Sequence, residues 1–206
     1  GKAVVQRWST RTAGALRIQH GSAGAGPLSI LDQAHYTPKQ LGAEVAAVSR
    51  GFVIRREWYR VPDSAGGSAP LEHLTGKAGG EYALTPGAVI EERIEFVNPA
   101  ARYHVAVTVP LAAGMEPLNP SLKGAPPEAA PSPSDDGMAT YRDVQDDRVA
   151  WFFDFLPKGT YRLHFRTKAV SRGRFVQPPA RVELMYDVAV NGRSHGSYVR
   201  VATAKP

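Results

Sequence analysis

The feature that most constrains the fold is an alternation of apolar and polar side chains over Thr160–Val170. One face holds Tyr161, Leu163, Phe165, Thr167 and Ala169, and the other holds Arg162, His164, Arg166 and Lys168. Successive side chains of a β-strand point to opposite faces of its sheet. The alternation therefore predicts a strand with one face on an apolar core and the other in water.

The same period recurs along the chain. Two more apolar faces are Tyr103, Val105, Val107 and Val109, and Ile90, Ile94 and Phe96, the latter opposite Glu91, Arg93 and Glu95. Val149–Leu156 is apolar nearly throughout, which is typical of a strand buried on both faces. Further predicted strands are Phe52–Val61, Arg181–Tyr186 and Ser197–Ala202.

Turn residues separate these strands. The predicted turns are Thr85-Pro86-Gly87, Asn98-Pro99, Pro157-Lys158-Gly159 and Asn191-Gly192. Pro178-Pro179 cannot lie in a central strand and marks a strand entrance or an edge. Many short strands with such turns predict a mainly β fold, an antiparallel Ig-like β-sandwich with long loops and little helix.

Helix and loop signals suggest where the chain divides. Pro38–Val48 is the best helix candidate, with an extended linker as the alternative. Ser64–Gly80 and Ser121–Gly137 are poor in apolar residues and are predicted to be mobile loops. Three strand-like pieces come first, Ala3–Trp8, Ala15–His20 and Leu28–Tyr36, too few for a closed core. We expect residues 1–45 to be the last strands and linker of a small flanking β-domain, and residues 46–206 to be the sandwich.

Composition narrows the classes of function. The chain of 206 residues has 43% hydrophobic and 21% charged residues, as in soluble globular proteins. It contains no cysteine, which excludes disulfides, thiolate metal sites and cysteine nucleophiles. No apolar run approaches the roughly 20 residues that span a bilayer, so we expect no membrane insertion.

The net charge of +6 is spread thinly. The densest basic group is the polar face of Thr160–Val170, where nucleic-acid binding would require a clustered footprint with aromatic residues. We expect instead an outer strand face paired with Glu91, Glu95 and Glu183, and no nucleic-acid partner.

Candidate catalytic residues do not form a recognisable constellation. The six histidines lack metal-ligand spacing, and His104 and His164 fall on predicted solvated faces. Asp143, Asp146 and Asp147 are too close in sequence to face each other across a cleft, and they predict a polar turn with neighbouring arginines. We expect no catalytic, cofactor-binding or metal residue, no cofactor, and a protein that is not an enzyme.

Two aromatic features allow more than one interpretation. Trp58, Tyr59 and Trp151–Phe153 are core residues by pattern, with a carbohydrate-binding platform as the alternative. Met185-Tyr186 ends a strand before a loop, where Tyr186 can cap the sandwich with its ring buried and its hydroxyl in water.

Read in order, several stretches resemble the C-terminal end of bacterial alpha-2-macroglobulins. Gly51–Tyr59 resembles the opening strand of the last domain, and Leu84–Val89 resembles an L-x-P-G-D-x-V turn with Ala88 in place of the acid. Tyr103–Pro120 is similar to a strand followed by PLPAGLE and NP, with Val109 where aspartate is frequent, and Asp146–Val149 matches R-D-D-R except at Gln145. The most specific run is Leu156–Tyr186, which is similar to LPxGxYxxxYxxRAxxPGxFxxPPAxxExMY with Arg172 in place of a proline. Gly24–Tyr36 resembles more weakly the strands that flank the helical thioester-type domain.

The resemblance implies a macroglobulin-type β-sandwich that packs on a helical thioester-type domain of the same parent chain. In family members with a thioester, a Met-Tyr pair covers the bond, and the matching positions are Met185 and Tyr186. The implied function is the C-terminal, non-catalytic domain of a periplasmic protease-trapping inhibitor of bacterial defence, which meets target proteases through its parent. A parent anchored in the inner membrane by its N-terminus is compatible with this location. The alternative is a stand-alone Ig-like adhesion or carbohydrate-binding sandwich.

Overall fold

The computed structural model describes residues 41–62, 70–76 and 80–203, which all belong to the unit of residues 38–206. The three strand-like pieces expected before residue 37 lie outside the described residues. The described part is a layered β structure in which all strand pairs are antiparallel except β4 with β14. The predicted mainly β, sandwich-like fold is confirmed.

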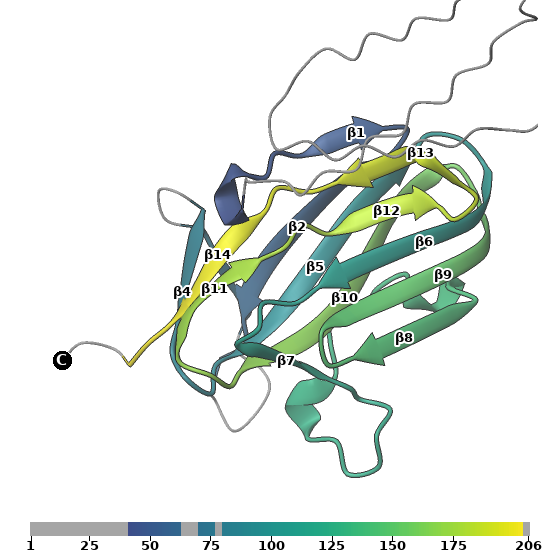
Figure 1. Ribbon diagram of the computed structural model, residues 1–206. Coiled ribbons are helices and arrows are strands. Elements are labelled where there is room, and N and C mark those ends of the chain that lie inside the picture. Colours follow the sequence, from purple (N-terminus) through teal and green to yellow (C-terminus); the bar gives the residue numbers. More distant parts are fainter. Residues whose placement is uncertain (1–40, 63–69, 77–79, 204–206) are drawn as a thin grey trace, which may run out of the picture. The chain divides into compact units, whose positions relative to one another are not determined.

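The strands form three sheets (Figure 1). The six-stranded sheet has the order β1-β13-β12-β6-β9-β8, with β1 (Val48–Arg50), β6 (Arg102–Pro110), β8 (Tyr141–Gln145), β9 (Arg148–Leu156), β12 (Arg181–Leu184) and β13 (Asp187–Arg193). The five-stranded sheet has the order β3-β2-β5-β10-β7, with β2 (Val53–Arg60), β3 (Glu72–Leu74), β5 (Val89–Asn98), β7 (Met115–Leu118) and β10 (Gly159–Ala169). The three-stranded sheet has the order β11-β14-β4, with β4 (Glu81–Leu84), β11 (Gly173–Gln177) and β14 (Ser197–Val201).

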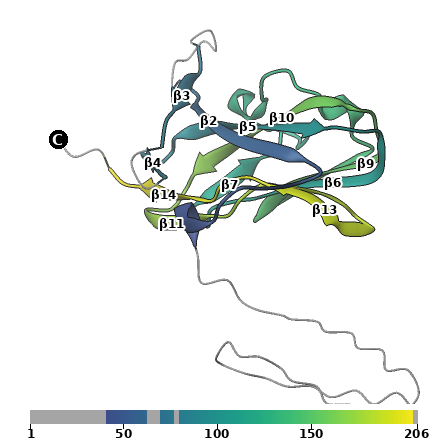
Figure 2. The same ribbon diagram turned by 90° about the horizontal axis from the view of Figure 1, so that it is seen from above.

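The five-stranded sheet is common to two apolar cores. The larger core lies between it and the six-stranded sheet, and it includes Phe96, Trp151 and Phe165, which are at most 1% exposed. The smaller core lies between it and the three-stranded sheet, around Trp58 and Val199. Figure 2 shows β2, β5 and β10 in one layer and β6, β9 and β13 in the layer opposite, with β4, β11 and β14 at one end.

A layer of polar side chains separates the two cores. Arg56, Glu92 and Thr167 occupy inward positions between apolar residues of the larger core and those of the smaller core. Glu92 is fully buried and accepts a hydrogen bond of 2.7 Å from Arg56 Nε and one of 3.3 Å from Thr167 Oγ1. Arg56 Nη1 donates to the carbonyl oxygens of Pro110 and Pro178 at 3.1 and 3.0 Å, and Nη2 forms the ion pair with Glu92. Gln177 Nε2 donates to the same two carbonyls.

This polar layer is located where the chain leaves one sheet for another. Pro110 ends β6 before the chain enters β7, and Pro178 follows β11 before the chain enters β12. A backbone carbonyl that leaves a sheet inside the protein needs another donor, and Arg56 supplies one to both. Burial raises the pKa of the Glu92 carboxyl above its ordinary value, although Arg56 opposes that shift.

Most sequence-predicted elements are confirmed, and Asn191-Gly192 is an exception. Instead of a turn, these residues lie inside β13, which pairs with both β1 and β12. A Cβ on Gly192 would be 2.7 Å from the carbonyl oxygen of Phe52, so the glycine allows two backbones to approach closely. The predicted turn at Gly87 is present and has a positive φ of 84°.

Two other expectations differ from the structure. The described part of Pro38–Val48 is a single 3-10 turn, η1 (Gly42–Glu44), followed by extended chain and the start of β1, which agrees with the extended-linker alternative and not with a helix. The expected mobile loop Ser121–Gly137 is instead an ordered segment that contains η2 (Pro127–Ala129) and the start of η3 (Asp136–Met138). Ala129 is 1% exposed, so part of this segment packs onto the body of the domain. Of Ser64–Gly80, the structure describes only residues 70–76 and Gly80, which include β3.

Candidate functional site

Met185 and Tyr186 are the two central residues of the turn that joins β12 to β13. Leu184 and Asp187 are paired on either side of this turn, which lies at the right-hand end of the six-stranded sheet in Figure 1. Tyr186 is 83% exposed and Met185 is 46% exposed. The interpretation of Tyr186 as a capping residue with a buried ring is therefore wrong, because the turn projects the ring into solvent.

The turn is attached to β6 through His104. Met185 N donates to His104 O at 2.9 Å, which extends the β12–β6 ladder by one hydrogen bond. The ring of Tyr186 meets the ring of His104 edge to face, with centroids 5.2 Å apart and an angle of 87°. Edge-to-face contact is a favoured geometry for aromatic pairs. The exposed pair is therefore held in a defined position.

Two further aromatic side chains lie at the same end of the sheet. Tyr103 in β6 and Phe155 in β9 are directly paired across the strands, with ring centroids 4.9 Å apart. They are 66% and 47% exposed, and Val188 in β13 is 61% exposed. We call this group the sheet-end patch; its members are Tyr103, His104, Phe155, Met185, Tyr186 and Val188. Clustered exposed apolar side chains mark interaction sites more often than isolated ones do.

Sequence reasoning assigned Tyr103 and Phe155 to the interior, and the structure contradicts both assignments. Tyr103 alternates in sequence with Val105, Val107 and Val109, which are buried, so it was expected on the same face. Phe155 lies in a stretch predicted to be buried on both faces. Alternation predicts orientation only while a strand stays regular, and His104 has a positive φ of 54°. The signal that was available in the sequence was two aromatic residues close to turns.

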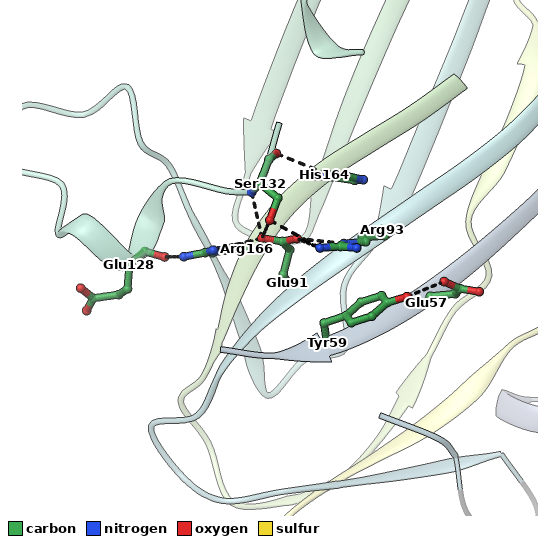
Figure 3. Close-up of polar contacts among 8 residues, drawn as sticks. All are labelled: Glu57, Tyr59, Glu91, Arg93, Glu128, Ser132, His164 and Arg166. Carbon is green, nitrogen blue, oxygen red and sulfur yellow. Dashed lines mark hydrogen bonds and ion pairs between the residues drawn. The ribbon is translucent and has the colours of Figure 1, made fainter. Parts of the chain in front are cut away.

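A second cluster surrounds Glu91 on the outer face of the five-stranded sheet (Figure 3). Glu91 Oε2 accepts hydrogen bonds from Ser132 N at 2.9 Å, from Ser132 Oγ at 3.0 Å and from Arg166 Nε at 3.1 Å. Its other oxygen accepts from Arg93 Nε at 2.9 Å. Burial raises the pKa of this carboxyl, but the hydrogen bonds from Ser132, Arg93 and Arg166 together bring it below its ordinary value.

These contacts dock the segment between β7 and β8 onto the sheet. Arg166 Nη1 donates to Glu128 O at 3.1 Å, and His164 Nδ1 donates to Ser132 O at 3.3 Å. Asp135 N donates to Arg162 O at 2.8 Å, and Asp135 Oδ2 accepts a hydrogen bond from Arg162 N at 2.7 Å. His164 is consequently 6% exposed, so the expectation of a solvated histidine is wrong there, while His104 is exposed as expected.

The basic face of β10 is used for internal pairing, as expected. Arg166 pairs with Glu91 and Arg162 with Glu95, each at 3.1 Å, whereas Glu183 pairs with Arg181 on its own strand. Asp146 and Asp147 form the predicted polar turn between β8 and β9, with Arg148 3.9 Å from Asp147. Glu91, Glu95 and Glu183 are thus each paired with an arginine within the domain.

Glu91 and Glu92 do not form a catalytic pair, even though their pKa values move in opposite directions. They are neighbours on β5 and point to opposite faces of the sheet, and each is enclosed by arginine and hydroxyl groups. A general acid and base must reach one substrate. Among the described residues there is no group of three or more acidic or histidine side chains that could hold a metal ion. No helix in the described ranges is long and apolar enough to cross a bilayer.

Comparison with known proteins gives a consistent result. The family model described as the bacterial alpha-2-macroglobulin MG10 domain matches residues 51–187, about two thirds of the chain. An alpha-2-macroglobulin homolog of Nostoc sp. is 29% identical over 111 residues, which cover 54% of this chain and 6% of that protein. The chain thus spans a small fraction of the length of its relative.

Solved structures show the same fold. Salmonella alpha-2-macroglobulin reacted with methylamine aligns with a TM-score of 0.58 and 16% identity, covering 81% of this chain and 10% of that one. Escherichia coli alpha-2-macroglobulin activated by porcine elastase aligns with a TM-score of 0.59 and 15% identity, covering 77% and 14%. The native E. coli protein from domain MG7 to the C-terminus aligns with a TM-score of 0.51 and 16% identity, covering 75% and 24%.

Proposed function

Because the chain belongs to the bacterial alpha-2-macroglobulin family through its MG10 domain, we propose that it is the C-terminal, non-catalytic domain of a protease-trapping protein. In this role it packs against the helical thioester-type domain of the same parent chain through the turn of Met185 and Tyr186. It meets target proteases only through the parent, which acts in the periplasm as an inhibitor in bacterial defence.

The observation that carries the proposal is the exposed and anchored turn. An apolar pair that is 46% and 83% exposed gains from burial on a partner, at about 25 cal/mol for each Å² of apolar surface removed from water. The contacts to His104 hold the turn in place, so less entropy is lost on docking. An activated acyl bond persists when water is excluded, and a thioether beside a phenol ring forms an apolar cover with a polar rim.

The relatives add support for the protease-trapping part of the proposal. The E. coli protein of the same fold is described as activated by porcine elastase, a protease. The alternative function as a carbohydrate-binding sandwich needs exposed aromatic rings on a flat face. Trp58 and Trp151, which the sequence pattern offered for such a platform, are 1% and 0% exposed, so neither can supply it.

The proposal is tested by titrating the full chain with the separately produced helical domain of its parent in a calorimeter. We expect Met185→Ala and Tyr186→Ala each to weaken binding by at least about tenfold, as for buried anchor residues. Met138→Ala and Tyr141→Ala are matched controls, because these side chains are 48% and 60% exposed but belong to η3 and to the edge strand β8, which β6 and β9 separate from β12. Binding that is equally strong in all four variants would remove the covering role.

A further inference from the structure

Four aromatic rings form a continuous row across the end of the six-stranded sheet. Centroid distances are 4.9 Å from Phe155 to Tyr103, 6.4 Å from Tyr103 to His104, and 5.2 Å from His104 to Tyr186. The rings come from β9, β6 and the β12–β13 turn, which lie side by side in the sheet. We call these four residues the aromatic row. The exposed aromatic surface therefore continues from the Met185–Tyr186 turn across the two neighbouring strands, β6 and β9.

The backbone of His104 interrupts the alternation of β6 next to Tyr103. In a regular strand the side chain of Tyr103 would point inward, as that of Val105 does, and the side chain of Arg102 would point outward. Here Tyr103 is exposed, and the guanidinium of Arg102 lies 4.3 Å from the ring centroid of the core residue Phe52. Arg102 and Val105 thus both lie on the inward side, three positions apart, and His104 between them has φ +54°. A positive φ is uncommon for a residue other than glycine, and such outliers gather at functional sites.

The alternation of inward and outward side chains is also interrupted in strand β9. Phe153 and Leu156 both belong to the larger core, and Phe155 between them is exposed. Because Tyr103 is paired with Phe155 and Arg102 with Leu156, the interruption in one strand matches that in the other. The outcome is an outward Tyr–Phe pair beside Tyr186 in place of two more core residues.

The charges around the aromatic row indicate which kind of partner fits it. None of its four side chains carries a fixed charge. Of the charged residues adjacent to them in the sequence, Asp154 and Asp187 are exposed, whereas the guanidinium of Arg102 lies over the ring of the buried Phe52. Carboxylates repel phosphate groups, which disfavours nucleic acid and anionic lipid headgroups. Tyrosine, with a flat apolar ring and a polar tip, is enriched at protein interfaces. A protein surface is therefore the kind of partner that fits the aromatic row.

We infer that the surface that docks on the helical thioester-type domain is the whole aromatic row, with Tyr103 and Phe155 as a second anchor and His104 as the positioning residue between the two anchors. This inference rests on the proposed function for the identity of the partner. It adds that three of the four rings in the contact come from β6 and β9, outside the Met–Tyr pair.

The binding test uses the full chain and the helical domain of the parent. Tyr103→Ala and Phe155→Ala are expected to weaken binding about tenfold. Tyr141→Ala and Phe152→Ala, which remove a similar Tyr–Phe pair with centroids 6.1 Å apart on strands β8 and β9, are expected to change it less than twofold. If Tyr186→Ala weakens binding but Tyr103→Ala and Phe155→Ala do not, this inference fails and the proposed function stands. If none of the three weakens binding, the proposed function fails as well.

The positioning role of His104 is tested in the chain alone by nuclear magnetic resonance. His104→Asn keeps a residue that tolerates a positive φ but removes the ring. We expect the Hα–Hβ couplings of Tyr186 to report one staggered rotamer in the original chain, an average of rotamers in the His104→Asn variant, and one rotamer again in His104→Phe. Couplings of Tyr186 that are the same in the original chain and in His104→Asn would overturn the positioning role.

Discussion

The ion pair between Arg56 and Glu92 gives a sharp test of how the interior is organised. The two side chains are 5% and 0% exposed, and Glu92 lies between the two apolar cores with Arg56 as its cationic partner. Removing one partner of a buried pair leaves an uncompensated charge and costs about 3–5 kcal/mol. We therefore expect Glu92→Gln to lower the free energy of unfolding by about 3–5 kcal/mol. For a domain of this size the melting temperature would fall by roughly 6–20 °C.

The matched control is Glu95→Gln on the same strand. Glu95 pairs with Arg162 at a similar distance of 3.1 Å, but these side chains are 40% and 65% exposed, and such pairs contribute about 0–1 kcal/mol. Urea denaturation followed by circular dichroism measures both variants in the full chain. Equal losses for Glu92→Gln and Glu95→Gln would refute the argument that burial sets the energy of the pair.

A double replacement separates charge from packing. In Arg56→Met with Glu92→Leu no buried charge is left, so we expect stability within about 2 kcal/mol of the original chain. The carbonyls of Pro110 and Pro178 lose their contact with Arg56 but keep the one from Gln177. A double variant as unstable as Arg56→Met alone would show that Arg56 stabilises the fold chiefly through those carbonyls.

Two further predictions concern the docked segment and a close backbone contact. Glu91 has a lowered pKa in the folded state, so its stabilising contribution is present above the ordinary glutamate pKa and is lost as the pH falls through the lower folded value. We expect trypsin to cut after the exposed Lys123 faster in Glu91→Gln than in the original chain at neutral pH, and no change in the rate would contradict the docking role of Glu91. Gly192→Ala should cost about 1–3 kcal/mol in urea denaturation, because its Cβ would be 2.7 Å from Phe52 O. Gly137→Ala, which meets no atom within 4 Å, should be nearly neutral, and equal effects would contradict the steric argument.

Several elements were predictable because they depend on local pattern alone. The predicted strand over Thr160–Val170 corresponds to β10, and the apolar face assigned to it is buried, from Tyr161 to Ala169. Turns at Gly87 and before Gly159 were predictable from the conformational limits of proline and glycine. Asn191-Gly192 has the same local chemistry as a turn, yet β1 and β12 pair on both sides of it and hold it in a strand.

The candidate site was only partly predictable. Met185 and Tyr186 were selected through a family resemblance, and the structure adds that they form an exposed turn attached to His104. Tyr103 was missed because the positive φ at His104 interrupts the alternation of β6, and Phe155 was missed because two consecutive residues of β9, Asp154 and Phe155, are exposed. Glu91 was expected to lie in water, and a segment from elsewhere in the chain covers it through Ser132.

The sequence by itself determined the main strands, most of their inward faces and the sandwich class, because alternation every two residues follows from the backbone of each strand alone. Tertiary structure alone decided which outward residues are covered and which inward positions are exposed. Burial depends on contacts between residues far apart in the chain, such as Ser132 with Glu91 and Arg56 with Pro178. A local pattern carries no information about those contacts.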